Sequence, residues 1–360
     1  MLELRIKYLL AFVPIAVAVD WLAPQWHVAV FTAASAAIVP LAAELGKTTE
    51  RLADKTGAAI GGLLNATFGN AAEMIIGLTA LRSGLGDVVK ASITGAVVGN
   101  LLLVLGGALL AGGLRYPTQT FNAAAARSRT TMLLLAAAAL IAPAVYHRLA
   151  GGHGPTHENG YSFEVSIVLV VSYALGLVFS LRTHRELFAG HTAEAGAVAE
   201  EEGPSPGEPW LLAILAVVTV LIAWMSEILV GSIQPVARQL GMTEVFIGVI
   251  VVAMIGNSAE HSTAILMATK DRMDLVLSIA IGSSIQIALL VAPVLVLASY
   301  IIAPAPINLV LTPAEVLAVT ISVVIAGQIC GDGESNWFEG MQLLAVYAIV
   351  ALLFYFLPAG

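Results

Sequence analysis

The amino-acid sequence predicts an all-α polytopic membrane protein with about 11 transmembrane helices: one extra N-terminal helix and two inverted five-helix repeats. Three observations predict this fold. The composition is too apolar for a water-soluble protein, long apolar runs alternate with short loops, and one short motif occurs twice.

The composition itself excludes several classes of protein. Hydrophobic residues make up 59% of the 360 residues and charged residues only 11%. Soluble domains are about 45–50% apolar and about 25% charged, so this chain could not cover a water-facing surface. The net charge of −8 leaves no basic patch for a nucleic acid. Cys330 is the only cysteine, which excludes an intrachain disulfide and a cysteine-based zinc site.

Each predicted span is an apolar run close to the ~20 residues that cross a bilayer. The first run continues to Leu22 and therefore fits a transmembrane helix better than a cleaved signal peptide. The predicted spans are 6–22, 27–46, 57–81, 88–112, 130–146, 161–181, 210–231, 245–269, 275–302, 307–330 and 338–357.

One long hydrophilic stretch, residues 182–209, separates the two halves and is rich in glutamate. A run of like charges is typical of a solvated, flexible segment. The alternative is that these carboxylates attract cytosolic cations. We predict four parts: an extra helix in 1–26, a first five-helix repeat in 27–181, an acidic cytoplasmic linker in 182–209 and a second five-helix repeat in 210–360.

The basic residues predict the orientation in the membrane. With eleven spans, twelve Lys and Arg lie on one side and four on the other, namely Arg82, Lys90, Arg148 and Arg238. Because cytoplasmic loops carry the excess of positive charge, we expect a multi-pass protein with a cytoplasmic N-terminus. A prokaryotic plasma membrane is favoured over a vacuolar one, because no long extension precedes the first span.

The internal repeat is the most informative feature of the chain. Gly69–Glu73 (Gly-Asn-Ala-Ala-Glu) recurs as Gly256–Glu260 (Gly-Asn-Ser-Ala-Glu), 187 residues later, and the same offset pairs Asp87 with Asp274. The two copies fall in the third and eighth predicted spans, which cross the membrane in opposite directions. Inverted repeats of this kind are typical of secondary transporters, whose sites lie where the repeats meet.

The repeated residues favour a cation site in the middle of the membrane. A carboxylate there costs roughly 2.5–3.5 kcal/mol, so the paired acids Glu73 and Glu260 indicate function rather than packing. Asn and Glu at positions i and i+3 share one helical face, so Asn70 and Asn257 should face the same centre. The glycines of the motif permit a backbone break that adds carbonyl ligands; these are Gly69 and Gly256.

Such a set of oxygens suits a hard divalent cation, and calcium in particular accepts 6–8 oxygens in flexible geometry. Two bare carboxylates cannot stay close together in a low dielectric, so protons should replace the cation when it leaves. Competition between cation and protons for Glu73 and Glu260 would give cation/proton exchange. His261 can titrate near neutral pH and is a candidate for proton handling or a plain interhelical hydrogen bond. Glu227 is a candidate pathway acid.

These motifs resemble the calcium/proton antiporters of the cation/proton exchanger family, within the calcium/cation antiporter superfamily. The similarity also covers Glu44–Glu50, Ser226–Glu227 and Gly282–Ile287. The resemblance implies that Glu73 and Glu260 carry calcium and protons. It also implies that Asn70, Asn257, Ser283 and Gln286 line the site.

The sequence departs from the family in one stretch, Gly95–Asn100, which lacks two serines that the family usually has. Ala72 stands where sodium-coupled relatives usually have proline, which favours protons over sodium. A sodium/calcium exchanger remains the alternative, and an intramembrane hydrolase or a channel is less favoured because hydrolase motifs are absent from the sequence. The expected partners are Ca2+, H+ and the lipid bilayer. We expect no enzymatic activity, no cofactor and no nucleic acid, and leave a homo-oligomer open.

Overall fold

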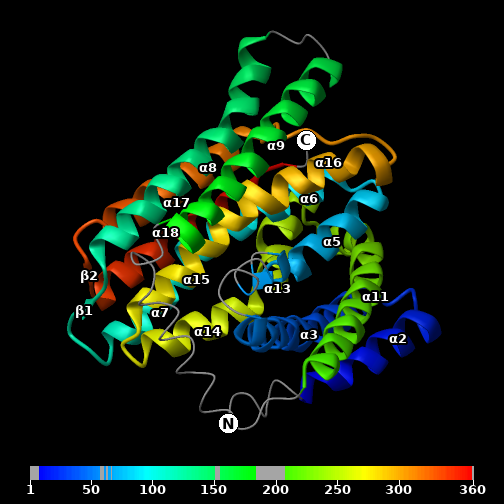
Figure 1. Ribbon diagram of the computed structural model, residues 1–360. Coiled ribbons are helices and arrows are strands. Elements are labelled where there is room, and N and C mark those ends of the chain that lie inside the picture. Colours follow the sequence, from blue (N-terminus) through cyan, green and yellow to red (C-terminus); the bar gives the residue numbers. More distant parts are fainter. Residues whose placement is uncertain are drawn as a thin grey trace.

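The computed structural model describes residues 8–56, 61, 64, 65, 67–150, 155–183 and 207–358. Most of the predicted acidic linker, including its glutamates at 194–202, lies outside the described residues. Within them the protein is a bundle of helices (Figure 1). The only strands of this part are β1 (Gln119–Thr120) and β2 (Glu334–Ser335), which pair antiparallel.

In chain order, one set of helices comes before residue 184 and a second set comes after residue 207. The first half holds η1 (Leu9–Ala11), α2 (Phe12–Leu22), α3 (His27–Thr56), α5 (Ala71–Arg82), α6 (Gly86–Val98), η2 (Gly99–Val104), α7 (Leu105–Gly113), α8 (Ala123–Leu149), α9 (Pro155–Val178) and η3 (Phe179–Thr183). The second half holds α11 (Glu208–Leu240), α12 (Glu244–Phe246), η5 (Ile247–Val252), α13 (Ala253–Gly256), α14 (Ser258–Ala268), α15 (Met273–Gln286), η6 (Ile287–Val291), α16 (Ala292–Ile302), α17 (Pro313–Ile329) and α18 (Trp337–Phe356).

Among the described residues, seven helices are long and apolar enough to cross a membrane, and a bent pair, Glu244–Gly256 with Ser258–Ala268, makes up an eighth span. Two shorter apolar helices, Leu9–Leu22 and Pro313–Ile329, accompany them. With α5, which covers the last part of the third run, the described part of each predicted apolar run therefore contains a helical segment. The all-helical membrane fold is confirmed.

Several predicted boundaries are wrong: α11 continues to Leu240 instead of ending at 231, and α8 and α9 start at Ala123 and Pro155 instead of at 130 and 161. The second run is predicted to end at 46, but α3 continues to Thr56, because six of the ten residues that follow are good helix formers (Lys, Glu, Arg, Leu and Ala) and none is proline or glycine. The tenth run was expected to start at 307, but α17 starts at Pro313. Thr312 caps this helix and Pro313 takes its first position, where a missing N–H does no harm.

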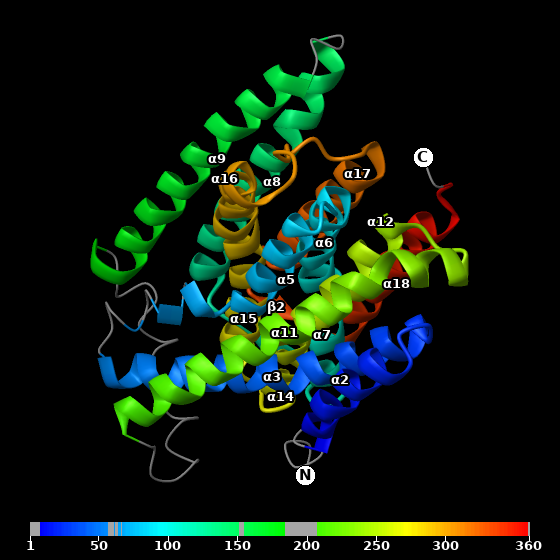
Figure 2. The same cartoon turned by 90° about the vertical axis from the view of Figure 1, so that its right-hand side faces the viewer.

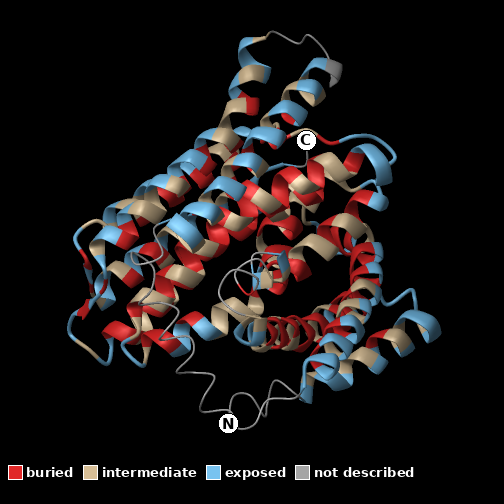
Figure 3. Cartoon of the chain, in the orientation of Figure 1, coloured by how far each residue is buried: buried red, intermediate tan, exposed pale blue. Residues whose placement is uncertain are grey.

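Buried residues gather in the middle of the bundle (Figure 3), and the most buried span is the α6–η2–α7 segment. In its most apolar stretch 78% of the residues are buried, against 17% for α9. The outer faces of α8 and α9 are therefore available to lipid. On the opposite side of the bundle α2, α3 and α11 pack together (Figures 1 and 2).

Loop contacts divide the bundle into two ends. At one end, which we call the Arg82 end, the α5–α6 loop meets the α16–α17 segment where Gly84 lies beside Pro304. At the other, the Asn122 end, the Asn122 N–H donates to Asp274 (2.9 Å), and β1 pairs with β2. The loops that meet at each end are those predicted to share one side of the membrane, so the order of crossings from α5 to α18 agrees with the predicted topology.

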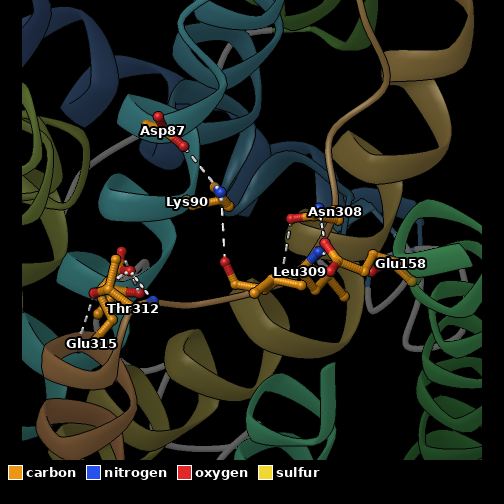
Figure 4. Close-up of polar contacts among 10 residues, drawn as sticks. Asp87, Lys90, Glu158, Asn308, Leu309, Thr312 and Glu315 are labelled. Atoms are coloured by element: carbon orange, nitrogen blue, oxygen red, sulfur yellow. Dashed lines mark hydrogen bonds and ion pairs between the residues drawn. The ribbon is translucent and has the colours of Figure 1, made fainter. Parts of the chain in front are cut away.

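At the Arg82 end, the segment before α17 is held between α6 and α9 (Figure 4). Lys90 of α6 forms an ion pair with Asp87 (3.0 Å) and donates to the Val310 carbonyl (3.5 Å). Asn308 donates to Glu158 of α9 (3.4 Å), and the Leu309 N–H donates to Ser162 (3.0 Å). These contacts tie the first half to the second.

Glu315 completes this arrangement and yields a stability prediction. Its Oε2 accepts hydrogen bonds from the Thr312 N–H (2.7 Å) and hydroxyl (2.8 Å), although Glu315 is only 3% exposed. We expect Glu315→Ala to lower the free energy of unfolding by about 1–2 kcal/mol, because the capping box is lost and the buried Thr94 hydroxyl loses its acceptor, Glu315 Oε1 (3.5 Å). Thermal unfolding in detergent measures this. Glu208→Ala, at an exposed acid in the first turn of α11, is the control and should change little; an equal effect of both variants would contradict the prediction.

Candidate ion-binding site

Both copies of the repeated motif lie where a helix starts in the middle of the bundle. Asn70 (φ −111°, ψ 30°) precedes α5, and Asn257 (φ −89°, ψ 11°) precedes α14. The second break bends the segment by 61°. Each break falls one residue after the glycine at which it was expected. It places Glu73 or Glu260 in the first turn of a helix, where the backbone dipole favours a negative charge.

Side chains from both halves meet beside Glu260. The Ser283 hydroxyl lies 2.9 Å and 3.0 Å from the two Glu260 oxygens and 3.0 Å from Asn70 Oδ1. A hydroxyl has one proton, so it donates to one of these acceptors at a time. Asn70 Nδ2 in turn donates to Gln286 Oε1. One first-half amide therefore joins an acid, a hydroxyl and an amide of the second half.

Glu73 reaches the same region by crossing the second backbone break. A Cβ added to Gly256 would lie 3.1 Å from Glu73 Cγ and 3.4 Å from its Oε1. Glycine at this position thus leaves room for the side chain of the other half. The structure therefore places Glu73 of the first half against Gly256 at the second backbone break, four residues before Glu260 in the chain.

Asn100, which sequence reasoning did not assign to the site, belongs to this cluster. It is 1% exposed and lies in η2, where its Nδ2 donates to Asn257 Oδ1 (3.2 Å). Asn257 Nδ2 donates to the Ala253 carbonyl (2.9 Å). Among the described residues, Asn100 Oδ1 has no hydrogen-bond partner. The sequence signal that could have identified Asn100 is its polar amide inside a long apolar run. This residue ends the stretch Gly95–Asn100, which drew attention only because it lacks two serines.

The two remaining candidates differ in position. His261, which follows Glu260 in the chain, lines a small pocket together with Asn257 and Tyr347. Glu227 is 61% exposed and forms an ion pair with Arg82 (3.7 Å) at the Arg82 end. Its neighbour Ser226 is fully buried, and a step of one residue turns a helical side chain by about 100°. The structure therefore does not bring Glu227 to Glu73 and Glu260.

Gly95 allows the backbones beside the site to touch. A Cβ added there would collide with the Val249 carbonyl of η5, whereas one added to its repeat partner Gly282 meets nothing within 4 Å. We expect Gly95→Ala to lower the free energy of unfolding by about 1–3 kcal/mol through overpacking. Gly282→Ala is the matched control, and thermal unfolding of both variants is the measurement. Equal stability of the two variants would contradict the prediction, because it would show that η5 can move away from the added methyl group at no cost.

The donor set defines what the cluster can bind. It consists of carboxylate, amide and hydroxyl oxygens. Nowhere in the described part of the chain do three or more His, Cys, Asp or Glu side chains lie together so that they could hold a metal ion. Hard cations prefer such oxygens, whereas soft metals prefer sulfur or imidazole. Two acids supply two negative charges, which matches one divalent cation or two protons.

Broken helices that present paired acids inside an apolar bundle define a secondary transporter. The model of the family described as sodium/calcium exchanger protein matches twice, at residues 26–182 and 210–356. The chain therefore belongs to the sodium/calcium exchanger family, which is a family of transporters and not of enzymes. The matched ranges lie close to the two predicted halves.

Individual relatives resemble the chain over nearly its full length. A Ca(2+)/H(+) antiporter of Aphanothece halophytica is 46% identical, covering 97% of this chain and 96% of the relative. The Ca(2+)/H(+) antiporter ChaA of Bacillus subtilis is 42% identical, covering 98% and 99%. The structure of native YfkE is 38% identical with a TM-score of 0.84, covering 99% and 100%. The H+/Ca2+ exchanger CAX shares the fold at a TM-score of 0.71 and 16% identity, covering 98% and 92%.

Proposed function

We propose that the protein exchanges cytosolic Ca2+ for H+ by alternating access, and that Glu73 and Glu260 bind Ca2+ or protons in competition. The observation that carries this proposal is that each acid meets the other half of the chain: Glu73 lies over Gly256, and Ser283 joins Glu260 to Asn70. The bacterial relatives at 46% and 42% identity, both named Ca(2+)/H(+) antiporters, support it.

The exchange follows from the charge of each state of the site. With Ca2+ bound, or with both acids protonated, the two carboxylates are neutralised and the site can pass through the apolar bundle. With both acids bare, two negative charges remain in a low dielectric, which is strongly unfavourable. The empty anionic site therefore does not reorient, and one cargo leaves only as the other returns. The pair requires at least two protons per Ca2+, and His261 is a candidate for a third.

The polar side chains around the two acids position them and supply further oxygen ligands. Ser283 and Asn70 contact the Glu260 side of the cluster, and Asn100 holds Asn257. We propose that Asn257, Gln286 and the carbonyls near Gly69 and Gly256 complete the coordination. The halves would act as inverted repeats, an arrangement that the double family match at 26–182 and 210–356 supports. The cytoplasmic N-terminus and a bacterial plasma membrane are parts of the same proposal.

The second candidate is a sodium/calcium exchanger, which the description of the matching family favours. Ca2+ uptake into proteoliposomes under an imposed pH gradient, or under a sodium gradient at equal pH, separates the two. We expect uptake driven by the pH gradient and none driven by sodium. Uptake driven only by sodium would overturn proton coupling, and no gradient-driven uptake would overturn the proposal as a whole. Mn2+ and Mg2+ as competitors define the selectivity.

A further inference from the structure

A small cavity lies beside Glu73 on the side toward the Arg82 end. Its volume is about 20 Å3, and its lining includes Ile76, Val252, Leu295 and Gly256. Among its lining residues only Glu73 and Ser92 have polar side chains. Because one water needs roughly 10–15 Å3 of such space and two or more polar partners, the cavity suits a single water molecule between these two residues.

The position of the cavity follows from the helices that line it. Ser92 lies on α6, closer than Ala96 to the start of this helix at the Arg82 end. Ile76 lies on α5, one turn after Glu73 in the direction of Arg82. Leu295 likewise lies on the part of α16 that leads to Tyr300, which bonds α9 at Asn159 at that end. The cavity therefore lies between the paired acids and the Arg82 end, which is the predicted non-cytoplasmic side.

The hydroxyl of Ser92 is suited to hold a water there. Ser92 Oγ donates to the Val89 carbonyl of its own helix (2.9 Å), so its lone pairs remain available as acceptors. The charged neighbours on α6 make other contacts: Lys90 forms an ion pair with Asp87 and donates to the Val310 carbonyl (Figure 4). The repeat partner of Ser92 is Ile279, so only the first half has this hydroxyl.

We propose that Ser92 positions a water molecule through which Glu73 exchanges protons with the Arg82 end. This proposal rests on the proposed function and assigns one direction of proton entry to one acid. The water donates one hydrogen bond to Ser92 Oγ and one to the Glu73 carboxylate. A proton arriving at this water passes along the second bond to a Glu73 oxygen, and the water is regenerated. Glu73 is the only titratable residue in the lining of the cavity, and farther out, at the Arg82 end, Arg82 pairs with Glu227.

The test compares two kinds of transport by Ser92→Ala in proteoliposomes. We expect the rate of H+-driven Ca2+ transport to fall about five- to tenfold, the effect of losing one hydrogen bond, and to need a lower pH at the Arg82 end. Ca2+/Ca2+ exchange, which moves no proton, should stay within about twofold of wild type. Ser92→Thr should restore H+-driven transport, because threonine keeps the hydroxyl and its bond to the helix backbone.

Ser322→Ala is the matched control, since Ser322 is a buried serine that donates to its own helix at the Ala318 carbonyl (2.7 Å) away from the site. Equal loss of both kinds of transport in Ser92→Ala would assign Ser92 a merely structural role and overturn the proposal. An unchanged rate and pH dependence would overturn it as well. If the wild type itself shows no H+-driven transport while Ca2+/Ca2+ exchange persists, the proposed function fails, and the role of Ser92 fails with it.

Discussion

Replacing either Glu73 or Glu260 by glutamine is expected to lower the rate of Ca2+/H+ exchange by at least about a hundredfold. Glutamine keeps the size and the hydrogen bonding of the side chain but removes the charge that titrates. One remaining carboxylate cannot balance a divalent cation, and breaking a buried charge arrangement costs about 3–5 kcal/mol. Since about 1.4 kcal/mol corresponds to a tenfold change, this loss exceeds any expected from the other variants.

Both variants should still fold, because a neutral amide costs less to bury than a carboxylate. Reconstitution at equal protein amounts, with uptake of radioactive Ca2+ under a pH gradient, measures the rate. Glu164→Gln, at an exposed acid on α9, is the control and should transport at the wild-type rate. Near wild-type exchange by either Glu73→Gln or Glu260→Gln would refute the idea that each acid is required.

Acidification is expected to weaken the apparent affinity for Ca2+ steeply. Protons and Ca2+ occupy the same oxygens, so metal binding must release protons. If both acids are protonated before Ca2+ binds, mass action lowers the apparent affinity by up to about a hundredfold per pH unit. The sign follows directly: affinity is highest at high pH and falls as the pH on the binding side decreases.

Half-maximal Ca2+ concentrations measured from pH 6 to pH 8, at equal pH on both sides of the vesicle, give this dependence. In Glu164→Gln the dependence should match the wild type, because this acid lies outside the cluster. A half-maximal concentration that changes less than twofold over this range would exclude competition at the paired acids. A dependence on one proton only would assign the second proton to another group, with His261 as the first candidate.

The sequence determined the features that depend on local composition and spacing. Apolar length predicted the helical segments, because each span must satisfy its own backbone hydrogen bonds inside the membrane. The offset of 187 residues between Glu73 and Glu260 identified the two acids, because a charged residue inside an apolar run is too costly to be incidental. The asparagines three residues before them followed from helical periodicity.

The tertiary structure decided which of these residues meet. Nothing in the spacing indicated that Ser283 would bridge Glu260 and Asn70, that Glu73 would pass over Gly256, or that Asn100 would hold Asn257. Glu227 resembled an intramembrane acid in the sequence, yet it pairs with Arg82 at an exposed end of the bundle. The physical reason is that the rotation and depth of each helix are set by packing against helices far away in the chain, and periodicity within one helix contains no information about its neighbours.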